Sequence, residues 1–112
     1  MNTKNVQMSD EINRRACLLF GSMSHPVRLK IVELLISQSR TVNEIASEIG
    51  LSQSGTSQHL AILHRAGILK VEQNGNTRRY IVRGPRVEKI VQLIVEFCEV
   101  HSLYGDAYPE EL

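Results

Sequence analysis

The spacing of apolar residues predicts two helices in the first third of the chain. Ser9 can cap a helix of about residues 9–23. Its apolar positions recur every three or four residues and form one stripe: Ile12, Ala16, Leu19 and Met23. Ser24, His25 and Pro26 mark a second start, because proline is tolerated in the first turn of a helix. The pattern of this second helix predicts four buried side chains: Val27, Ile31, Leu34 and Leu35.

The middle of the chain has the pattern of a helix-turn-helix. Thr41 and Glu44 have the spacing of a capping box before a short helix, which Gly50 ends. Ser52 can cap the next helix, and Gly67 is placed to end it. Because so few residues separate the two helices, we expect a helix-turn-helix over about residues 41–66.

A hairpin and a last helix complete the predicted fold. The runs "ILKVEQ" and "RRYIV" are rich in strand-forming residues and flank "NGNT", and Asn-Gly between such runs is a strong hairpin signal, so a wing is expected over about residues 68–83. Gly84 and Pro85 open a helix of about residues 85–104. Its apolar residues share one face: Val87, Ile90, Val91, Ile94, Phe97 and Cys98. The fold class is mainly α with a small β-hairpin, a winged helix-turn-helix with an extra helix at each end, in a single domain of residues 1–112.

The second helix of the helix-turn-helix has two unlike faces. A helical wheel turns one set of residues toward the core: Thr56, His59, Leu60, Leu63 and Ala66. The opposite face is short-chained, polar and nearly uncharged: Gln53, Ser54, Ser57, Gln58, Ala61 and Arg65. Serines compete with helix formation, whereas hydroxyl and amide groups suit hydrogen bonds to base edges. We interpret this as a recognition helix; the alternative is a merely solvated surface element.

The charge distribution agrees with a nucleic-acid interface. The chain has 112 residues and a net charge of +1, yet residues 52–86 hold six basic side chains and one acidic one, and residues 87–112 the reverse. Arg78 and Arg79 stand just past the hairpin tip, where they can reach phosphates or the minor groove. We interpret His59 as a core-edge histidine rather than a base contact or a metal ligand. His64 lies nearer the exposed side.

Composition excludes several other classes of protein. The polar start of the chain has no signal-peptide core, and no apolar run has membrane-spanning length, so we expect a cytoplasmic protein without a membrane partner. Two cysteines do not make a secreted disulfide framework. No nucleophile motif and no phosphate-cradling glycine loop is present, which argues against an enzyme.

Three stretches together resemble the ArsR/SmtB family of winged-helix repressors: "MSHPVRLKIVELL", "TVNEIASEIGLSQSGTSQHLAILHRAGIL" and "NGNTRRYIV". The resemblance implies a homodimer formed by the terminal helices, which binds a two-fold operator in double-stranded DNA and releases it when an effector arrives. The apolar stripes of the terminal helices fit a dimer independently. A protein-interaction module without DNA binding is the alternative function.

Many members of the family that this chain resembles sense metals, but the chain lacks the ligands of both recurrent metal-site patterns. One pattern needs cysteines where this chain has Thr41 and Asn43. The other needs Asp, His or Glu at positions occupied by Gly84, Arg86, Phe97 and Val100. Zinc sites need several convergent nitrogen or sulfur ligands, so no metal and no cofactor is expected.

Two cysteines and one histidine are the effector candidates. We hypothesise that Cys17 and Cys98 form a redox or sulfur-reactive pair whose oxidation lowers operator affinity. The alternative, which is favoured, is that both are buried and structural. A third possibility is an atypical metal or haem site of Cys98 and His101 from both subunits. The inducer itself is unknown from the sequence.

Overall fold

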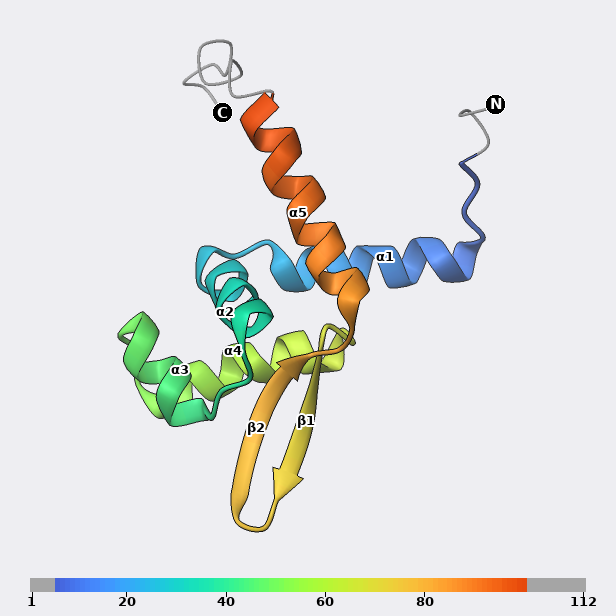
Figure 1. Ribbon diagram of the computed structural model, residues 1–112. Coiled ribbons are helices and arrows are strands. Elements are labelled where there is room, and N and C mark those ends of the chain that lie inside the picture. The colour runs from blue at the N-terminus through green and yellow to red at the C-terminus, as the bar shows by residue number, and fades with distance from the viewer. Residues whose placement is uncertain (1–5, 101–112) are drawn as a thin grey trace.

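The computed structural model describes residues 6–100, which form five helices and one hairpin in the predicted order. The elements are α1 (Asp10–Met23), α2 (Pro26–Ser37), α3 (Val42–Ile49), α4 (Gln53–Arg65), β1 (Leu69–Asn74), β2 (Thr77–Val82) and α5 (Pro85–Val100). Figure 1 shows the hairpin extending from one end of α4 while α1 and α5 lie on the opposite side of the molecule. His101 and the predicted continuation of the last helix to about residue 104 lie outside the described residues.

The predicted helix caps are present. The Ser9 hydroxyl accepts a hydrogen bond from the backbone N–H of Ile12 at 3.1 Å, and the Ser52 hydroxyl accepts one from Gly55 at 3.0 Å. Thr41 and Glu44 form the capping box of α3. Such side chains satisfy N–H groups that have no partner within the helix.

The core is built around α2, which contacts every other helix and β2. Three of its residues are buried: Ile31, Val32 and Leu35. The prediction for this helix was partly wrong, because Val27 and Leu34 are only half-buried and Val32 was not expected to be buried. A helix covered on several sides buries more than one stripe, which the one-stripe pattern did not anticipate. The remaining buried hydrophobic residues come from the neighbouring segments: Met23, Ile45, Ala46, Leu60, Leu63, Ile68 and Leu69.

The hairpin turn lies one residue later than the Asn-Gly signal suggests. Asn74 and Thr77 are paired, so the two turn residues are Gly75 and Asn76, and Gly75 has a φ of +59°. Glycine at positive φ in the first turn position is typical of a type II′ turn, which matches the twist of the strands. Asn74 therefore belongs to β1 rather than to the turn.

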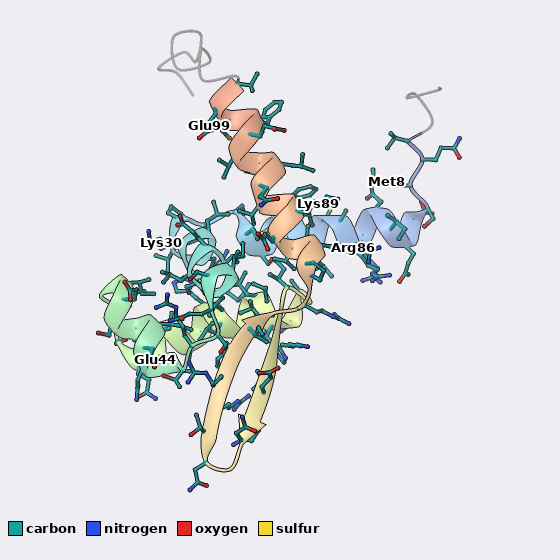
Figure 2. All side chains as sticks on the ribbon, in the orientation of Figure 1. Met8, Lys30, Glu44, Arg86, Lys89 and Glu99 are labelled. Carbon is teal, nitrogen blue, oxygen red and sulfur yellow. The ribbon has the colours of Figure 1, made fainter. Side chains whose placement is uncertain are left out.

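The terminal helices are poorly covered within the chain. No residue of α5 is buried, and α1 buries only Ser22 and Met23 at its end. Both helices carry exposed large apolar side chains: Ile12, Leu18 and Phe20 on α1, and Leu93, Val95, Phe97 and Val100 on α5. Figure 2 shows the side chains around Met8 and Glu99 projecting beyond the rest of the molecule. Most residues of the predicted stripes are half-buried, and Leu19, Val87, Ile90 and Val91 pack against the core, so the exposed apolar surface lies mainly beside these stripes.

Candidate nucleic-acid interface

Helix α4 is held in place by buried residues on one face only. Leu60 and Leu63 are fully buried in the core, and so is Thr56, whose hydroxyl donates a hydrogen bond to the carbonyl of Ser52 at 2.8 Å. His59 and Ala66 are half-buried at the edge of this face. The helical wheel therefore predicted correctly which side of α4 faces the core.

The opposite face of α4 is open to solvent along its whole length. Its exposed residues are those expected to contact DNA: Gln53, Ser54, Ser57, Gln58 and Arg65, with Ala61 among them. The structure gives these side chains almost no partners, apart from a 3.4 Å contact between the hydroxyls of Ser52 and Ser54. Their donors and acceptors are available to a ligand.

The wing places Arg78 and Tyr80 on the same side of β2, since side chains two residues apart in a strand point to one face. The Arg78 guanidinium lies over the Tyr80 ring at 5.8 Å from its centroid, in cation–π geometry. Arg78 is exposed. The ring therefore restrains a cationic group that remains accessible.

A mostly polar groove of about 510 Å³ lies between the starts of α3 and α4 and the wing. Its lining includes Asn43, Gln53, Ser57, Asn76, Arg78 and Tyr80. The structure thus brings three of the residues expected to bind DNA, Gln53, Ser57 and Arg78, to one surface. Sequence analysis did not identify Asn43, Asn76 or Tyr80 as part of it; Asn76, next to the glycine of the turn, could have been found from its place at the wing tip.

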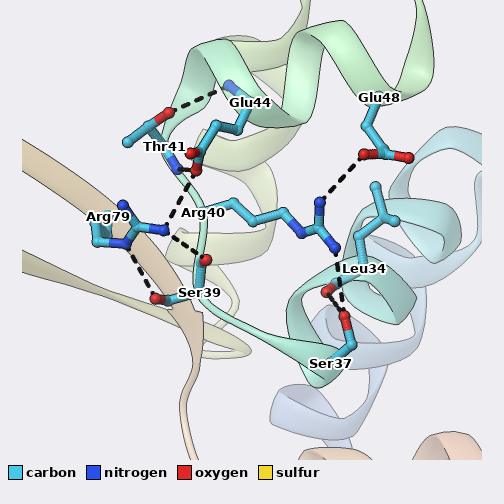
Figure 3. A network of polar contacts seen from close by, with 8 residues as sticks. All are labelled: Leu34, Ser37, Ser39, Arg40, Thr41, Glu44, Glu48 and Arg79. Carbon is cyan, nitrogen blue, oxygen red and sulfur yellow. Dashed lines mark hydrogen bonds and ion pairs between the residues drawn. The ribbon is translucent and has the colours of Figure 1, made fainter.

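Arg79 has a different environment from its neighbour Arg78. Its guanidinium donates hydrogen bonds to Ser39 and pairs with Glu44 at 3.3 Å, as Figure 3 shows. The pKa of Glu44 is lowered, chiefly by the hydrogen bond from the Thr41 backbone and further by the positive charges of Arg79 and Arg40. The Glu44 carboxylate is therefore ionised at neutral pH.

Arg65 lies away from the groove, at the far end of α4. It lines a separate, mainly apolar pocket of about 290 Å³ between α1 and α4, together with Cys17, Leu18 and Ile62. The structure does not bring Arg65 to the surface that Gln53 and Arg78 share.

His59 belongs to a small cluster at the inner edge of α4. Its Nδ1 lies 3.4 Å from the Arg28 guanidinium, and its ring lies 4.8 Å from that of His25, centroid to centroid. Burial lowers the pKa of His59, and the charges of His25 and Arg28 lower it further. The interpretation of His59 as a core-edge histidine is confirmed.

The two cysteines are free thiols and both are exposed in the chain, not buried as the structural alternative supposed. No Cα atom of α1 lies within 8 Å of a Cα atom of α5. A disulfide needs Cα atoms within about 7 Å. An intrachain bond between Cys17 and Cys98 would therefore require one of the helices to move.

Residues 6–100 contain neither a candidate metal site nor a candidate membrane span. No three His, Cys, Asp or Glu side chains converge there in a way that suits a metal ion. None of the helices in that range is both long and apolar enough to cross a membrane.

These features define the class of the protein: a winged helix-turn-helix protein with a polar, unpartnered face on its second helix and a cation on its wing. Residues 25–71 match the model of the arsR family of bacterial regulatory proteins. The chain belongs to the ArsR family and is thus a DNA-binding transcriptional regulator rather than an enzyme.

Two sequence relatives support the assignment to this family of regulators. The chain is 32% identical over 84 residues to the transcriptional regulator Rv0081 of Mycobacterium tuberculosis, covering 74% of each chain. It is 31% identical over 103 residues to the transcriptional activator HlyU of Vibrio cholerae, covering 92% of this chain and 90% of HlyU.

Solved structures are similar as well. The crystal structure of Rv0081 superposes with a TM-score of 0.75 at 27% identity and covers 90% of this chain and all of that one. The structure of HlyU from Vibrio cholerae, which is also solved in a reduced form, superposes with a TM-score of 0.71 at 30% identity. The match covers 80% of this chain and 97% of the HlyU chain. The homodimeric winged helix-turn-helix DNA-binding domain Mb0332 from Mycobacterium bovis shares the fold, with a TM-score of 0.78 at 22% identity. The match covers 86% of this chain and 92% of that domain.

Proposed function

We propose that this regulator binds a two-fold operator as a homodimer and represses the adjacent promoter in the cytoplasm. In this arrangement the exposed face of α4 enters the major groove, and the wing lies on the neighbouring backbone. The two recognition helices of a dimer then meet successive major grooves about one helical turn apart. Repression follows from occupancy, because a dimer on the operator blocks access to the promoter.

The observation that carries this proposal is the groove shared by α4 and the wing. Gln53 and Ser57 offer amide and hydroxyl groups without partners, and Arg78 offers an exposed cation on the opposite wall. A glutamine amide can bond adenine at two points, and arginine pairs with phosphate oxygens. One surface thus combines groups that read bases with a group that binds the backbone.

A second copy of the chain is the proposed cover for the terminal helices. Leu18 on α1 is 55% exposed and Leu93 on α5 is 58% exposed, and α1 and α5 do not cover one another. Apolar patches of this kind on a small domain mark interaction surfaces. The homodimeric Mb0332 domain has the same fold, which supports the pairing of two copies.

We further propose that thiol chemistry at Cys17 and Cys98 releases the operator. Both thiols are exposed and lie on the two helices proposed to form the dimer. No Cα atom of α1 lies within 8 Å of one of α5, so the reaction is not a bond within one chain. Either an oxidant takes two electrons from two thiols of different protomers, which lose two protons and form a disulfide, or a polysulfide transfers one sulfur atom to a single thiol and leaves one sulfur shorter, which gives a persulfide. Either event alters the packing of α1 and α5 and so changes the distance between the two recognition helices. His101, the third candidate, lies outside the described residues.

Selection of bound duplexes from a random pool tests the proposed function. We expect a dimer on a two-fold sequence, with affinity that falls steeply as salt rises, because bound phosphates release their counterions. Gln53→Ala should relax base preference at one position of each half-site, whereas Gln38→Ala, an exposed glutamine at the end of α2, should not. A monomeric protein, or one that binds no duplex at low salt, contradicts the proposal.

A further inference from the structure

The two adjacent arginines of the wing point to opposite faces of β2. Successive side chains of a strand alternate, so Arg78 shares a face with Tyr80 and Arg79 does not. Arg78 lines the groove beside α4 and is exposed, whereas the Arg79 side chain is 34% exposed and turned toward the connection between α2 and α3. Equal charge and adjacency in sequence therefore do not imply equal roles.

Arg79 uses most of its donors within the chain. Its Nε donates to the Ser39 hydroxyl at 3.1 Å, and its Nη2 donates to the Ser39 carbonyl at 2.9 Å and to Glu44 Oε1 at 3.3 Å (Figure 3). The fixed fork of the guanidinium allows three such bonds at once, which a lysine ammonium cannot reproduce in the same plane. Only Nη1 is left without one of these contacts.

Glu44 connects Arg79 to the start of the helix-turn-helix. The same oxygen, Oε1, accepts a hydrogen bond from the Thr41 backbone at 2.9 Å and is the partner of Arg79. Glu44 thus belongs both to the capping box that starts α3 and to the contact with the wing. A shift of the wing would disturb the cap, and a frayed cap would release the wing.

The backbone joins the same two segments. Arg40 and Tyr80 exchange hydrogen bonds, N–H of Arg40 to the Tyr80 carbonyl at 3.1 Å and N–H of Tyr80 to the Arg40 carbonyl at 2.8 Å. The side chain of Arg40 pairs in turn with Glu48 of α3 at 3.2 Å. An isolated two-stranded hairpin is marginally stable, so these contacts restrain β2 where it leaves the body of the molecule.

We propose that Arg79 is a positioning residue: with Ser39 and Glu44 it fixes the wing relative to α3 and α4, so that Arg78, and not Arg79, reaches the DNA backbone. This assignment rests on the proposed DNA-binding function and divides the two wing arginines between two tasks. In this assignment the contacts of Arg79 with Ser39 and Glu44 act together with the backbone bonds between Arg40 and Tyr80 to hold the wing opposite Gln53.

The sign of the Glu44→Gln effect tests the proposal. Removing a negative charge near DNA should tighten binding if charge alone matters. We expect weaker binding, by about fivefold, because the charged partner of Arg79 is lost, and hydrogen bonds to charged groups are the stronger ones. Glutamine still accepts from the Thr41 backbone, so the capping box survives. Glu72→Gln is the matched control: Glu72 is paired with Arg79 across the hairpin, but among the described residues the ion pair of Arg79 is with Glu44 and not with Glu72. This variant removes the same charge and should bind as tightly as the wild type or more tightly.

Arg79→Lys separates positioning from direct contact. A lysine keeps the charge for a phosphate but loses the fork, so the positioning role predicts binding about fivefold to tenfold weaker, and the direct-contact role predicts little change. Arg78→Ala should lower the salt dependence by about one phosphate contact per protomer. Interference footprinting gives the decisive readout: Arg79→Lys and Glu44→Gln should lose protection at the phosphates of the wing and keep it at the bases under α4.

The outcomes discriminate between the possible failures. If Arg79→Lys and Glu44→Gln lose footprint protection equally at the phosphates of the wing and at the bases under α4, and also unfold at a lower temperature, the residues have a general structural role. That result overturns the positioning role. Wild-type affinity of Arg79→Lys, or tighter binding by Glu44→Gln, overturns it as well. If the wild-type protein binds no duplex, the proposed function fails and this assignment fails with it, whereas sequence-specific binding that is insensitive to both changes leaves the function intact and refutes only the assignment.

Discussion

The winged part of the chain and the terminal helices differ in how much of their apolar surface is buried. From α2 to β1 the large apolar residues converge on a common core, and Ile31, Leu60 and Leu63 are completely buried there. In α5 no residue is buried, and α1 buries only its last turn. Burial of apolar area is the main force that holds a domain together. The winged part supplies most of the core, to which α1 adds Met23, whereas the terminal helices have apolar surface left for a second copy.

The two regions also differ in what they leave exposed. The outer face of α4 exposes amides and hydroxyls, which need a hydrogen-bonding partner such as a base edge. The outer faces of α1 and α5 expose Leu18, Leu93 and other apolar residues, which are stabilised by an apolar partner surface that excludes water. One surface suits DNA and the other suits protein, and five variants or conditions test this division.

The largest effect is expected in the winged core. Leu60→Ala should lower the free energy of unfolding by about 2–5 kcal/mol, because it removes a fully buried side chain and leaves a cavity. Ala61→Ser, at the next and exposed position, should change it by less than about 0.5 kcal/mol. Urea unfolding followed by circular dichroism measures both. Similar values for the two variants would show that α4 is not anchored as described.

Breaking the dimer should have the next largest effect. The double variant Leu18→Glu with Leu93→Glu should sediment as a folded monomer and bind the operator about a hundredfold more weakly, because the two half-sites are no longer engaged together. Leu51→Glu, which places the same charge on an exposed leucine of the helix-turn-helix, should remain a dimer. A double variant that still sediments as a dimer would place the interface elsewhere.

Removing the cation of the wing should have a smaller effect. Arg78→Ala should weaken operator binding about tenfold, since a hydrogen bond to a charged group is worth about 1.5–3 kcal/mol and part of it is regained by water. Arg86→Ala, which removes an exposed arginine at the start of α5, is the control. Fluorescence anisotropy at several salt concentrations gives both the affinity and the number of phosphate contacts; equal losses for the two variants would argue against a specific role of the wing.

The pH dependence of stability should be modest and of one sign. The pKa of His59 is lowered in the folded chain, mainly by burial, so the unfolded chain binds more protons once the pH falls below about 6.5. Stability should therefore be lost on acidification from pH 7 to pH 5, and protonation also removes the acceptor that faces Arg28. Unfolding temperatures of His59→Gln should depend less on pH over this range, whereas those of the exposed variant His64→Gln should follow the wild type.

The smallest effect on affinity is expected at the thiols. Cys17→Ser with Cys98→Ser should bind the operator within about twofold of the wild type, because exposed side chains of similar size contribute little to stability. The same variant should no longer release the operator on treatment with an oxidant or a polysulfide. An unchanged response would exclude thiol chemistry as the signal, and mass spectrometry of the treated wild type would show whether two protomers are joined.

Sequence pattern predicted the local features of this fold well. The caps at Ser9, Thr41 and Ser52, and the buried and exposed faces of α4, follow from interactions within one or two helical turns. Such interactions depend on side-chain type and spacing, which the sequence contains in full. The order of the elements followed for the same reason.

The errors and omissions concern contacts between distant segments. Burial of Val32 depends on how many neighbours surround α2. Arg65 leaves the groove because the far end of α4 lies against α1, and the joint surface of Asn43 and Tyr80 exists only once the hairpin lies beside α3. None of these juxtapositions has a signal in residue spacing.

The sequence by itself thus determined the helices, the hairpin, the polar face of α4 and the presence of two cations at the wing. Only the tertiary structure decided that Arg78 faces the groove while Arg79 binds Ser39 and Glu44, and that Cys17 and Cys98 are exposed on helices with no Cα atoms within 8 Å of each other. The physical reason is the range of the interactions. Hydrogen bonds of caps and turns join close neighbours in sequence, whereas the partners of Arg79 and the exposure of a thiol are set by packing between segments that are far apart in sequence, 35 and 40 residues for Glu44 and Ser39.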